Sequence, residues 1–220
     1  MKRVWLLKGK TRRLTIFFGG WAMDENIALL DGSGDVLMFY DYRDISREEA
    51  PDLSRYKSVD VAAWSMGVWA ASVLLDRWGL VPRRAVALNG TGRPVDDLLG
   101  IPVAFYDLTE RHLDGRGRER FYERILDGRE ERLAFNARHR TNRPLDEMAE
   151  ELTSLREQSV AGAPDVKWDK AYISVNDRVF PAENQQRWWE GRCEIAYLRG
   201  GHYPFFRFAT WESIIDHEDN

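Results

Sequence analysis

Five residues in the first third of the chain have the types and spacing of a reactive serine turn. They read Ala63-Trp64-Ser65-Met66-Gly67, which matches the pattern Gly-x-Ser-x-Gly with Ala in the first position. Small residues are needed there because the turn is sharp and the flanking strand and helix pass close together. Such a turn would expose the Ser65 hydroxyl at the edge of a sheet, where it could attack a carbonyl carbon.

A serine hydroxyl is a poor nucleophile until a base removes its proton, and the chain has four histidines that could do so. His202 follows two glycines and an apolar run, so a tight loop can bring its ring to the sheet edge. His112 and His139 fall in a charged segment, where we expect solvated surface side chains. His217 lies in an acidic tail. His202 is therefore the candidate base.

The imidazole of a base needs a carboxylate to orient it. Asp177 follows the apolar run 171–175 and would lie in the turn after a strand. Asp165 and Asp169 precede the same run and would lie at the opposite edge of the sheet, so Asp177 is preferred. Serine, aspartate and histidine then occur in the chain order of α/β-hydrolases, which differs from that of chymotrypsin-like and subtilisin-like enzymes.

Acyl transfer also needs donors aimed at the negative charge of the tetrahedral intermediate. The backbone N–H of Met66, directly after the serine, would be one donor. The loop at residues 19–24 follows an early strand and begins with two glycines, and we assign the second donor to the backbone N–H of Trp21. The side chains of Trp21, Trp64 and Met66 are predicted to line the substrate pocket, although core packing would also explain both tryptophans.

The elements that would position these residues alternate between strands and helices, which predicts a mostly parallel α/β sheet. Strands are expected at residues 14–18, 36–40, 59–63, 85–88, 101–105, 171–175 and 194–198, with helices at 66–78 and 183–189. From residue 107 to 160 the chain is charged and helical in pattern. We therefore expect a hydrolase core at 1–106 and 161–220, and a helical insertion at 107–160 that lies over the strand ends.

Composition excludes several other classes of protein. The chain has 220 residues, 44% hydrophobic and 31% charged, with a net charge of −4, which disfavours a nucleic-acid binder. The mostly apolar stretch at 68–75, which Ser72 interrupts, is too short to span a membrane, and the amino-terminal run is too short for a signal peptide. The single cysteine, Cys193, excludes an internal disulfide and fits a small buried side chain. We expect a cytoplasmic protein that needs no metal.

Four segments together resemble the BioG-type pimeloyl-acyl-carrier-protein methyl ester esterases: FFGGWAMD at 17–24, AAWSMGVWA at 62–70, LNGT at 88–91 and GHYPF at 201–205. The resemblance spans essentially the whole chain. It implies an α/β-hydrolase fold with a helical cap, and removal of the methyl group from the distal carboxylate of pimeloyl-acyl-carrier protein during biotin biosynthesis. It also implies Ser65 as nucleophile, His202 as general base, Asp177 as its orienting carboxylate, and no cofactor. Ala22 departs from the pattern, since we expect Gly there.

The partner that the resemblance implies is an acidic acyl-carrier protein, which calls for a basic surface near the pocket. Residues 111–143 contain ten arginines against six acidic residues, whereas residues 144–160 contain five acidic residues and one arginine. The basic half of the insertion could dock the carrier protein. It could equally be a solvated helical face with charge pairs at i,i+4 spacing.

Two other functions remain open at this point. A general short-chain carboxylesterase or thioesterase would use the same three residues, and only a comparison of substrates separates it. A hydrolase-fold binding module with an idle site would not react with a serine-directed probe. The methyl ester of a seven-carbon chain would require a long apolar channel that leads to Ser65.

Overall fold

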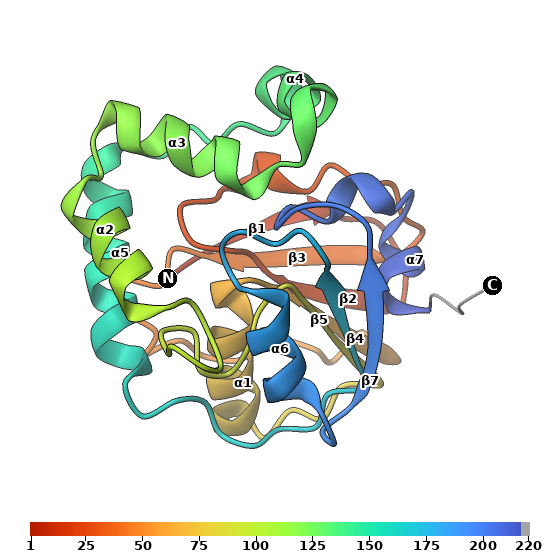
Figure 1. Ribbon diagram of the computed structural model, residues 1–220. Coiled ribbons are helices and arrows are strands. Elements are labelled where there is room, and N and C mark those ends of the chain that lie inside the picture. Colours follow the sequence, from red (N-terminus) through yellow and green to blue (C-terminus); the bar gives the residue numbers. More distant parts are fainter. Residues whose placement is uncertain (217–220) are drawn as a thin grey trace.

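The structure, a computed structural model, describes residues 1–216, so His217 lies outside the described residues. Seven strands form one sheet in the order β1-β3-β2-β4-β5-β6-β7 (Figure 1). Within the described residues, β2 to β7 run parallel and β1 is antiparallel to β3. The strands are β1 (Lys2–Leu7), β2 (Arg13–Phe18), β3 (Asp35–Tyr40), β4 (Ser58–Trp64), β5 (Arg84–Leu88), β6 (Lys170–Ser174) and β7 (Glu194–Leu198). The predicted α/β fold with a mostly parallel sheet is confirmed.

Both faces of the sheet are covered, and two adjacent phenylalanines of β2 show how. Successive side chains of a strand point to opposite faces. Phe18 packs against Phe39 and against Trp78 of α1 (Met66–Trp78). Phe17 packs against Trp211 of α7 (Trp211–Ile215), on the other face. Helix α6 (Ala182–Trp189) lies beside α1 (Figure 1). The sheet is thereby held rigid between two apolar layers, which fixes the loops at its edge.

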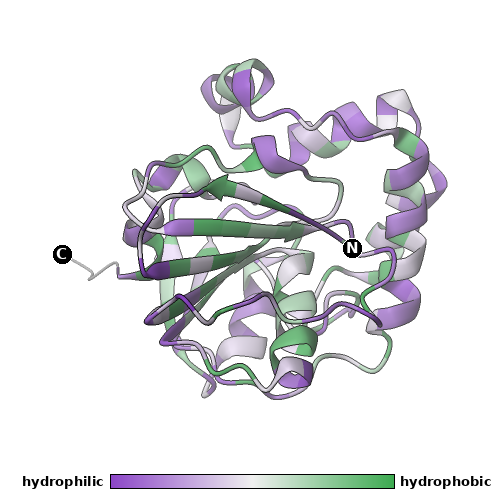
Figure 2. Cartoon of the chain, turned by 180° about the vertical axis from the view of Figure 1, so that it is seen from behind, coloured by the Kyte–Doolittle hydropathy of each residue, from purple (hydrophilic) through white to green (hydrophobic). Residues whose placement is uncertain are grey.

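Four consecutive helices between β5 and β6 form a cap over one side of the sheet (Figure 1). They are α2 (Val103–Arg111), α3 (Gly115–Ile125), α4 (Gly128–Arg138) and α5 (Leu145–Ser159). Figure 2 shows much hydrophilic surface on these helices, whereas the strands are largely hydrophobic. The buried positions of these helices are mostly apolar, such as Phe121 and Phe135, and these packed faces hold the cap on the core.

Two expectations about the elements were wrong. The apolar run at 101–105 is not a strand: Ile101 makes a single bridge to Val95, Pro102 is the N-cap, and α2 begins at Val103. Proline fits a helix start because the first helical N–H groups have no partner in any case. Strand β1 was not predicted; its side chains are exposed or only half-buried at the sheet edge. No described helix is long and apolar enough to cross a membrane.

Candidate active site

The turn after β4 holds Ser65 in a strained backbone conformation, with φ 60° and ψ −128°. The Ser65 N–H donates to the carbonyl of Leu88, the last residue of β5, at 2.9 Å. A Cβ at Gly67 would lie 2.3 Å from the carbonyl oxygen of Phe18, which explains why only glycine fits there. The predicted elbow is therefore present, with three strand ends packed around it and Ala63 fully buried.

His202 lies in the loop after β7 and faces the serine. Its Nε2 is 2.9 Å from Ser65 Oγ, and its Nδ1 is 2.8 Å from Asp177 Oδ2. The ring is 1% exposed, and it stacks on Phe180 at 5.8 Å with an interplanar angle of 8°. The three side chains are thus hydrogen-bonded in series, in the arrangement that serine hydrolases use to remove the hydroxyl proton.

Asp177 is held by four donors in the turn after β6. Its Oδ1 accepts the backbone N–H groups of Val179 and Phe180 at 2.8 and 2.9 Å. Its Oδ2 accepts Nε2 of Gln185, on α6, at 3.0 Å, in addition to the imidazole. With every contact donating to it, the carboxylate is fixed in the orientation that aligns His202. Sequence reasoning did not find Gln185, because its distance along the chain gives no sign of this contact.

The alternative carboxylates lie elsewhere. Asp169 precedes β6 and accepts the backbone N–H of Ala85, at the opposite end of the strand from Asp177. Asp165 pairs with Arg192 at 2.9 Å. Neither contacts His202, which leaves Asp177 as its carboxylate partner.

Two backbone N–H groups beside Ser65 have no acceptor within residues 1–216: those of Trp21 and Met66. Both residues line the small cavity next to Ser65, as expected. The adjacent Ala22 has φ 68°, in the left-handed region that glycine prefers, so the residue where glycine was expected does adopt a glycine-like conformation. The indole Nε1 of Trp21 donates to the carbonyl of Met148, on α5, at 2.9 Å.

The cavity beside Ser65 is narrow and mostly apolar. Its volume is about 30 Å³, and its lining includes Trp21, Met66, Phe105, Phe121 and Leu152. A wider groove of about 310 Å³ between α2 and α3 shares Thr109, Phe121 and Arg124 with this cavity and opens to solvent. The two hollows therefore adjoin at these shared walls, and the long apolar channel to Ser65 stays a prediction.

Trp64 does not line this cavity, contrary to expectation. Its side chain points away from the cavity and packs against the ring of His202 at 5.3 Å. Its Nε1 donates to the carbonyl of His202 at 2.8 Å. Trp64 therefore supports the histidine loop rather than a substrate.

A second support of that loop is Asn89, which belongs to the LNGT segment at 88–91. It follows β5 with φ 46° and is buried. Its Nδ2 donates to Ser174 Oγ at 2.8 Å and to the carbonyl of His202 at 2.9 Å, and its Oδ1 accepts the N–H of Ser174. Asn89 thus joins the ends of β5 and β6 to the loop that carries the base.

The arginines of the cap do not form one uniform surface. Arg143 is 4% exposed and pairs with Asp41 and Glu151, so it cannot belong to a docking face. Arg120 and Arg124, on α3, line the groove, and no carboxylate of the described residues lies within 4.0 Å of either. The guanidinium of Arg124 lies 3.9 Å from the Phe105 ring, and burial lowers its pKa.

Two further residues that the sequence singled out, His139 and Cys193, lie outside the candidate active site. His139 is half-buried rather than solvated: its Nδ1 is 3.0 Å from the carbonyl of Asn26, and its ring packs on Phe206. Burial raises the pKa of the Cys193 thiol to about 12, so that it remains protonated at neutral pH. This agrees with the expected role of Cys193 as a small packing residue.

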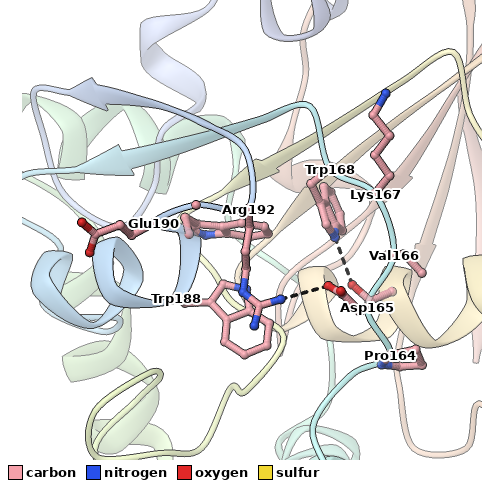
Figure 3. A pocket seen from close by; sticks show the side chains of 11 residues that line it. Pro164, Asp165, Val166, Lys167, Trp168, Trp188, Glu190 and Arg192 are labelled. Carbon is pink, nitrogen blue, oxygen red and sulfur yellow. Dashed lines mark hydrogen bonds and ion pairs between the residues drawn. The ribbon is translucent and has the colours of Figure 1, made fainter.

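A wide hollow of the described surface lies away from Ser65. Its volume is about 560 Å³, and it is lined by residues 164–168 and 188–192, at the amino ends of β6 and β7 (Figure 3). Arg192 lies 4.4 Å from the Trp188 ring there and pairs with Asp165. None of the candidate active-site residues lines this hollow.

Comparison with known proteins agrees with the geometry. The family described as pimeloyl-ACP methyl esterase BioG matches residues 2–214. An uncharacterised protein of Haemophilus influenzae is 36% identical over 212 residues, 93% of this chain and 94% of that protein. A malonyl-[acyl-carrier protein] O-methyltransferase of Bacteroides fragilis is 36% identical over 192 residues, 86% of this chain but 39% of that longer protein.

Solved structures give the same result. The crystal structure of BioG from H. influenzae has a TM-score of 0.88 and 33% identity, and covers 98% of this chain and 100% of that chain. A putative aryl esterase from Burkholderia cenocepacia, at 16% identity and a TM-score of 0.65 over 93% of this chain and 88% of that one, shares the fold. The chain has the fold of the α/β-hydrolases, and it belongs to the BioG family of pimeloyl-ACP methyl esterases, which are carboxylic ester hydrolases.

Proposed function

We propose that this protein hydrolyses the methyl ester of pimeloyl-acyl-carrier protein with Ser65 as nucleophile, His202 as general base and Asp177 as the carboxylate that orients it. The observation that carries the proposal is the unbroken series of hydrogen bonds from Ser65 through His202 to Asp177 in a member of this family. The product would be the carrier-bound acyl chain with a free distal carboxylate, as biotin biosynthesis requires.

The reaction proceeds in two halves. His202 Nε2 takes the Ser65 proton as Oγ attacks the ester carbonyl, and the N–H groups of Trp21 and Met66 donate to the oxyanion. The tetrahedral intermediate collapses, and methanol leaves with the proton from His202. Water then attacks the pimeloyl-serine with His202 as base again, which releases the carboxylate and restores Ser65.

The groove between α2 and α3 supports a route for the carrier-bound chain. It leads from solvent to the cavity at Ser65, and Arg120 and Arg124 lie on its wall without a carboxylate partner among residues 1–216. Guanidinium groups so placed can bind the phosphate that links an acyl arm to its carrier, or acidic groups of the carrier. The closed cavity holds about one water, so the apolar cap helices must separate to admit seven carbons.

The test is hydrolysis of pimeloyl-acyl-carrier protein methyl ester beside a short aryl ester, with Ser65→Ala as control. We expect demethylation by the wild-type protein that the Ser65→Ala variant loses while it unfolds at an unchanged temperature. Turnover of the aryl ester alone would indicate a general carboxylesterase. Absence of both activities, together with no labelling by a fluorophosphonate, would indicate a binding module and refute the proposal.

A further inference from the structure

A fully buried carboxylate, Glu151 on α5, has no part in the mechanism above. It is 0% exposed, and it accepts a hydrogen bond from Arg143, which is 4% exposed. Arg143 Nη2 also lies 3.2 Å from Oδ1 of Asp41, which is 2% exposed. A buried ion pair contributes little to stability relative to apolar side chains of similar volume, because both charges must be removed from water. Its position in the molecule therefore calls for another explanation.

Glu151 reaches from the cap to the loop that carries one of the proposed oxyanion donors. Its Oε2 accepts the N–H of Ala22 at 3.2 Å, and its Oε1 accepts the N–H of Tyr42 at 2.8 Å. Burial raises the pKa of Glu151, while the Arg143 charge and these two N–H groups act in the opposite direction. The carboxylate is thus satisfied on both oxygens by groups of three separate segments.

The same loop is held by the cap at two further points. The indole of Trp21 donates to the carbonyl of Met148, one turn before Glu151 on α5. The Asp24 Oδ2 accepts the N–H of Asn142, just before α5, at 2.6 Å. Residues 21–24 are therefore attached to the cap at three successive points, whereas the Trp21 N–H itself is left without an acceptor in the described chain.

The Ala22 contact matters most for geometry. Ala22 has φ 68°, in the left-handed region that disfavours an alanine, so a hydrogen bond from outside the loop helps to keep this conformation. The peptide between Trp21 and Ala22 is fixed by Glu151, and the Trp21 ring by Met148. The Trp21 N–H belongs to the preceding peptide, between Gly20 and Trp21. The two contacts hold the side chain of Trp21 and the peptide that follows it, and so restrict the backbone rotations at Trp21 that would turn this N–H away. Displacing such a donor lowers transition-state stabilisation and leaves ground-state binding unchanged.

We propose that Glu151, held by Arg143, is a positioning residue that keeps the Trp21–Ala22 peptide oriented so that the Trp21 N–H points at the oxyanion. The inference rests on the proposed function, because it concerns the oxyanion donor of that reaction. It makes the cap a structural part of the catalytic site in addition to its cover over the substrate.

The test distinguishes the loss of the hydrogen-bond acceptor at Glu151 from the loss of its negative charge. In Glu151→Gln, the amide oxygen at the Oε2 position still accepts from Ala22 and Arg143, but the amide NH₂ then faces the N–H of Tyr42. We therefore expect kcat to fall less in Glu151→Gln than in the double variant that follows. The double variant Arg143→Met/Glu151→Met removes the acceptor without leaving a buried charge at either position. We expect its kcat on a small aryl ester to fall about 10- to 100-fold with an unchanged KM. Its affinity for an alkyl trifluoromethyl ketone, which forms the tetrahedral adduct, should fall by the same factor.

The matched control is Arg55→Met/Asp35→Met. Asp35 is 1% exposed, pairs with Arg55 and accepts the N–H of Gly9, but none of these residues lines the cavity at Ser65. This control should change the unfolding temperature and leave kcat and the inhibitor affinity at wild-type values. If the first double variant does not fold, Glu151→Asp serves instead, because it keeps the charge and withdraws the oxygens by one methylene.

The outcomes distinguish the two proposals. The positioning role would be overturned if the folded Arg143→Met/Glu151→Met variant kept wild-type kcat and inhibitor affinity. The same holds for Glu151→Asp where that variant is used instead. The esterase assignment would stand in either case. A rise in KM with kcat unchanged would also overturn the positioning role. Failure of the wild-type protein to hydrolyse any ester would instead refute the proposed function on which it rests.

Discussion

Replacing Asp177 with asparagine should trap the base in the wrong tautomer. The two backbone N–H groups of Val179 and Phe180 hold Oδ1 at 2.8 and 2.9 Å, so the amide oxygen of the Asp177→Asn variant must take that position. The amide NH₂ then replaces Oδ2, 2.8 Å from His202 Nδ1. Two donors cannot face each other, so Nδ1 loses its proton and Nε2 gains it. A protonated Nε2 cannot accept the proton of Ser65.

The magnitude follows from that reversal. An aspartate-to-asparagine change of this kind in another serine hydrolase lowers kcat by about 10⁴, equivalent to about 5 kcal/mol of activation free energy. Gln185 cannot relieve the conflict cheaply, because turning its amide would break the bond from Nε2 to the carbonyl of Phe180 at 2.7 Å. We therefore expect a loss of about 10⁴ in kcat for Asp177→Asn, with an unfolding temperature close to that of the wild type.

The assay is single-turnover and steady-state hydrolysis of an aryl ester at neutral pH. Asp169→Asn is the matched control, since its carboxylate accepts a backbone N–H at the other end of β6 and does not contact His202. That control should keep wild-type kcat. A kcat for Asp177→Asn within tenfold of wild type would refute the tautomer argument and the assignment of Asp177.

Three further outcomes are expected. Arg120→Gln/Arg124→Gln should raise KM for a carrier-bound ester at least about tenfold and leave KM for a small ester unchanged. The control is Arg129→Gln/Arg138→Gln, at exposed positions of α4. Equal effects of the two pairs on KM would contradict the docking role. Gly67→Ala should lower stability by about 3 kcal/mol, seen as a drop of roughly 6–12 °C in the unfolding temperature, because its Cβ would meet a β2 carbonyl at 2.3 Å. Since a pKa of about 12 leaves little thiolate, the partly buried Cys193 should react with iodoacetamide at pH 8 about a thousandfold more slowly than a free cysteine. Its reaction should become faster as pH rises, and rapid labelling at pH 8 would show that the thiol pKa is not raised.

The sequence allowed the central strands and the series Ser65, Asp177 and His202 to be predicted, because each follows a locally apolar run. Parallel strands bring their carboxyl ends to one edge, so strand order is not needed to bring these residues together. Ala22 was also correctly marked as unusual, because the resemblance to the family led us to expect glycine at that position.

What could not be predicted depends on distant contacts. Glu151 and Arg143 look like two more charges of a solvated helix, and only the packing of α5 against the loop at Ala22 shows that both are buried. Trp64 could face either the cavity or the histidine loop, and the direction of the β4 terminus decides between them. The edge strand β1 is paired through β3, more than 30 residues away, which local periodicity does not record.

The position of the cap between β5 and β6 has a consequence for folding of the nascent chain. Val86 pairs with Lys170 and Leu88 with Tyr172, across the whole of residues 89–169. Closing a loop of about 80 residues costs roughly 4 kcal/mol of chain entropy, about 1 kcal/mol more than a loop of about 20. Helices of the cap that form early shorten this loop. Ser65 leaves the ribosome with the first strands, whereas His202 is synthesised 137 residues later, so the proposed nucleophile stays inert until its base has emerged.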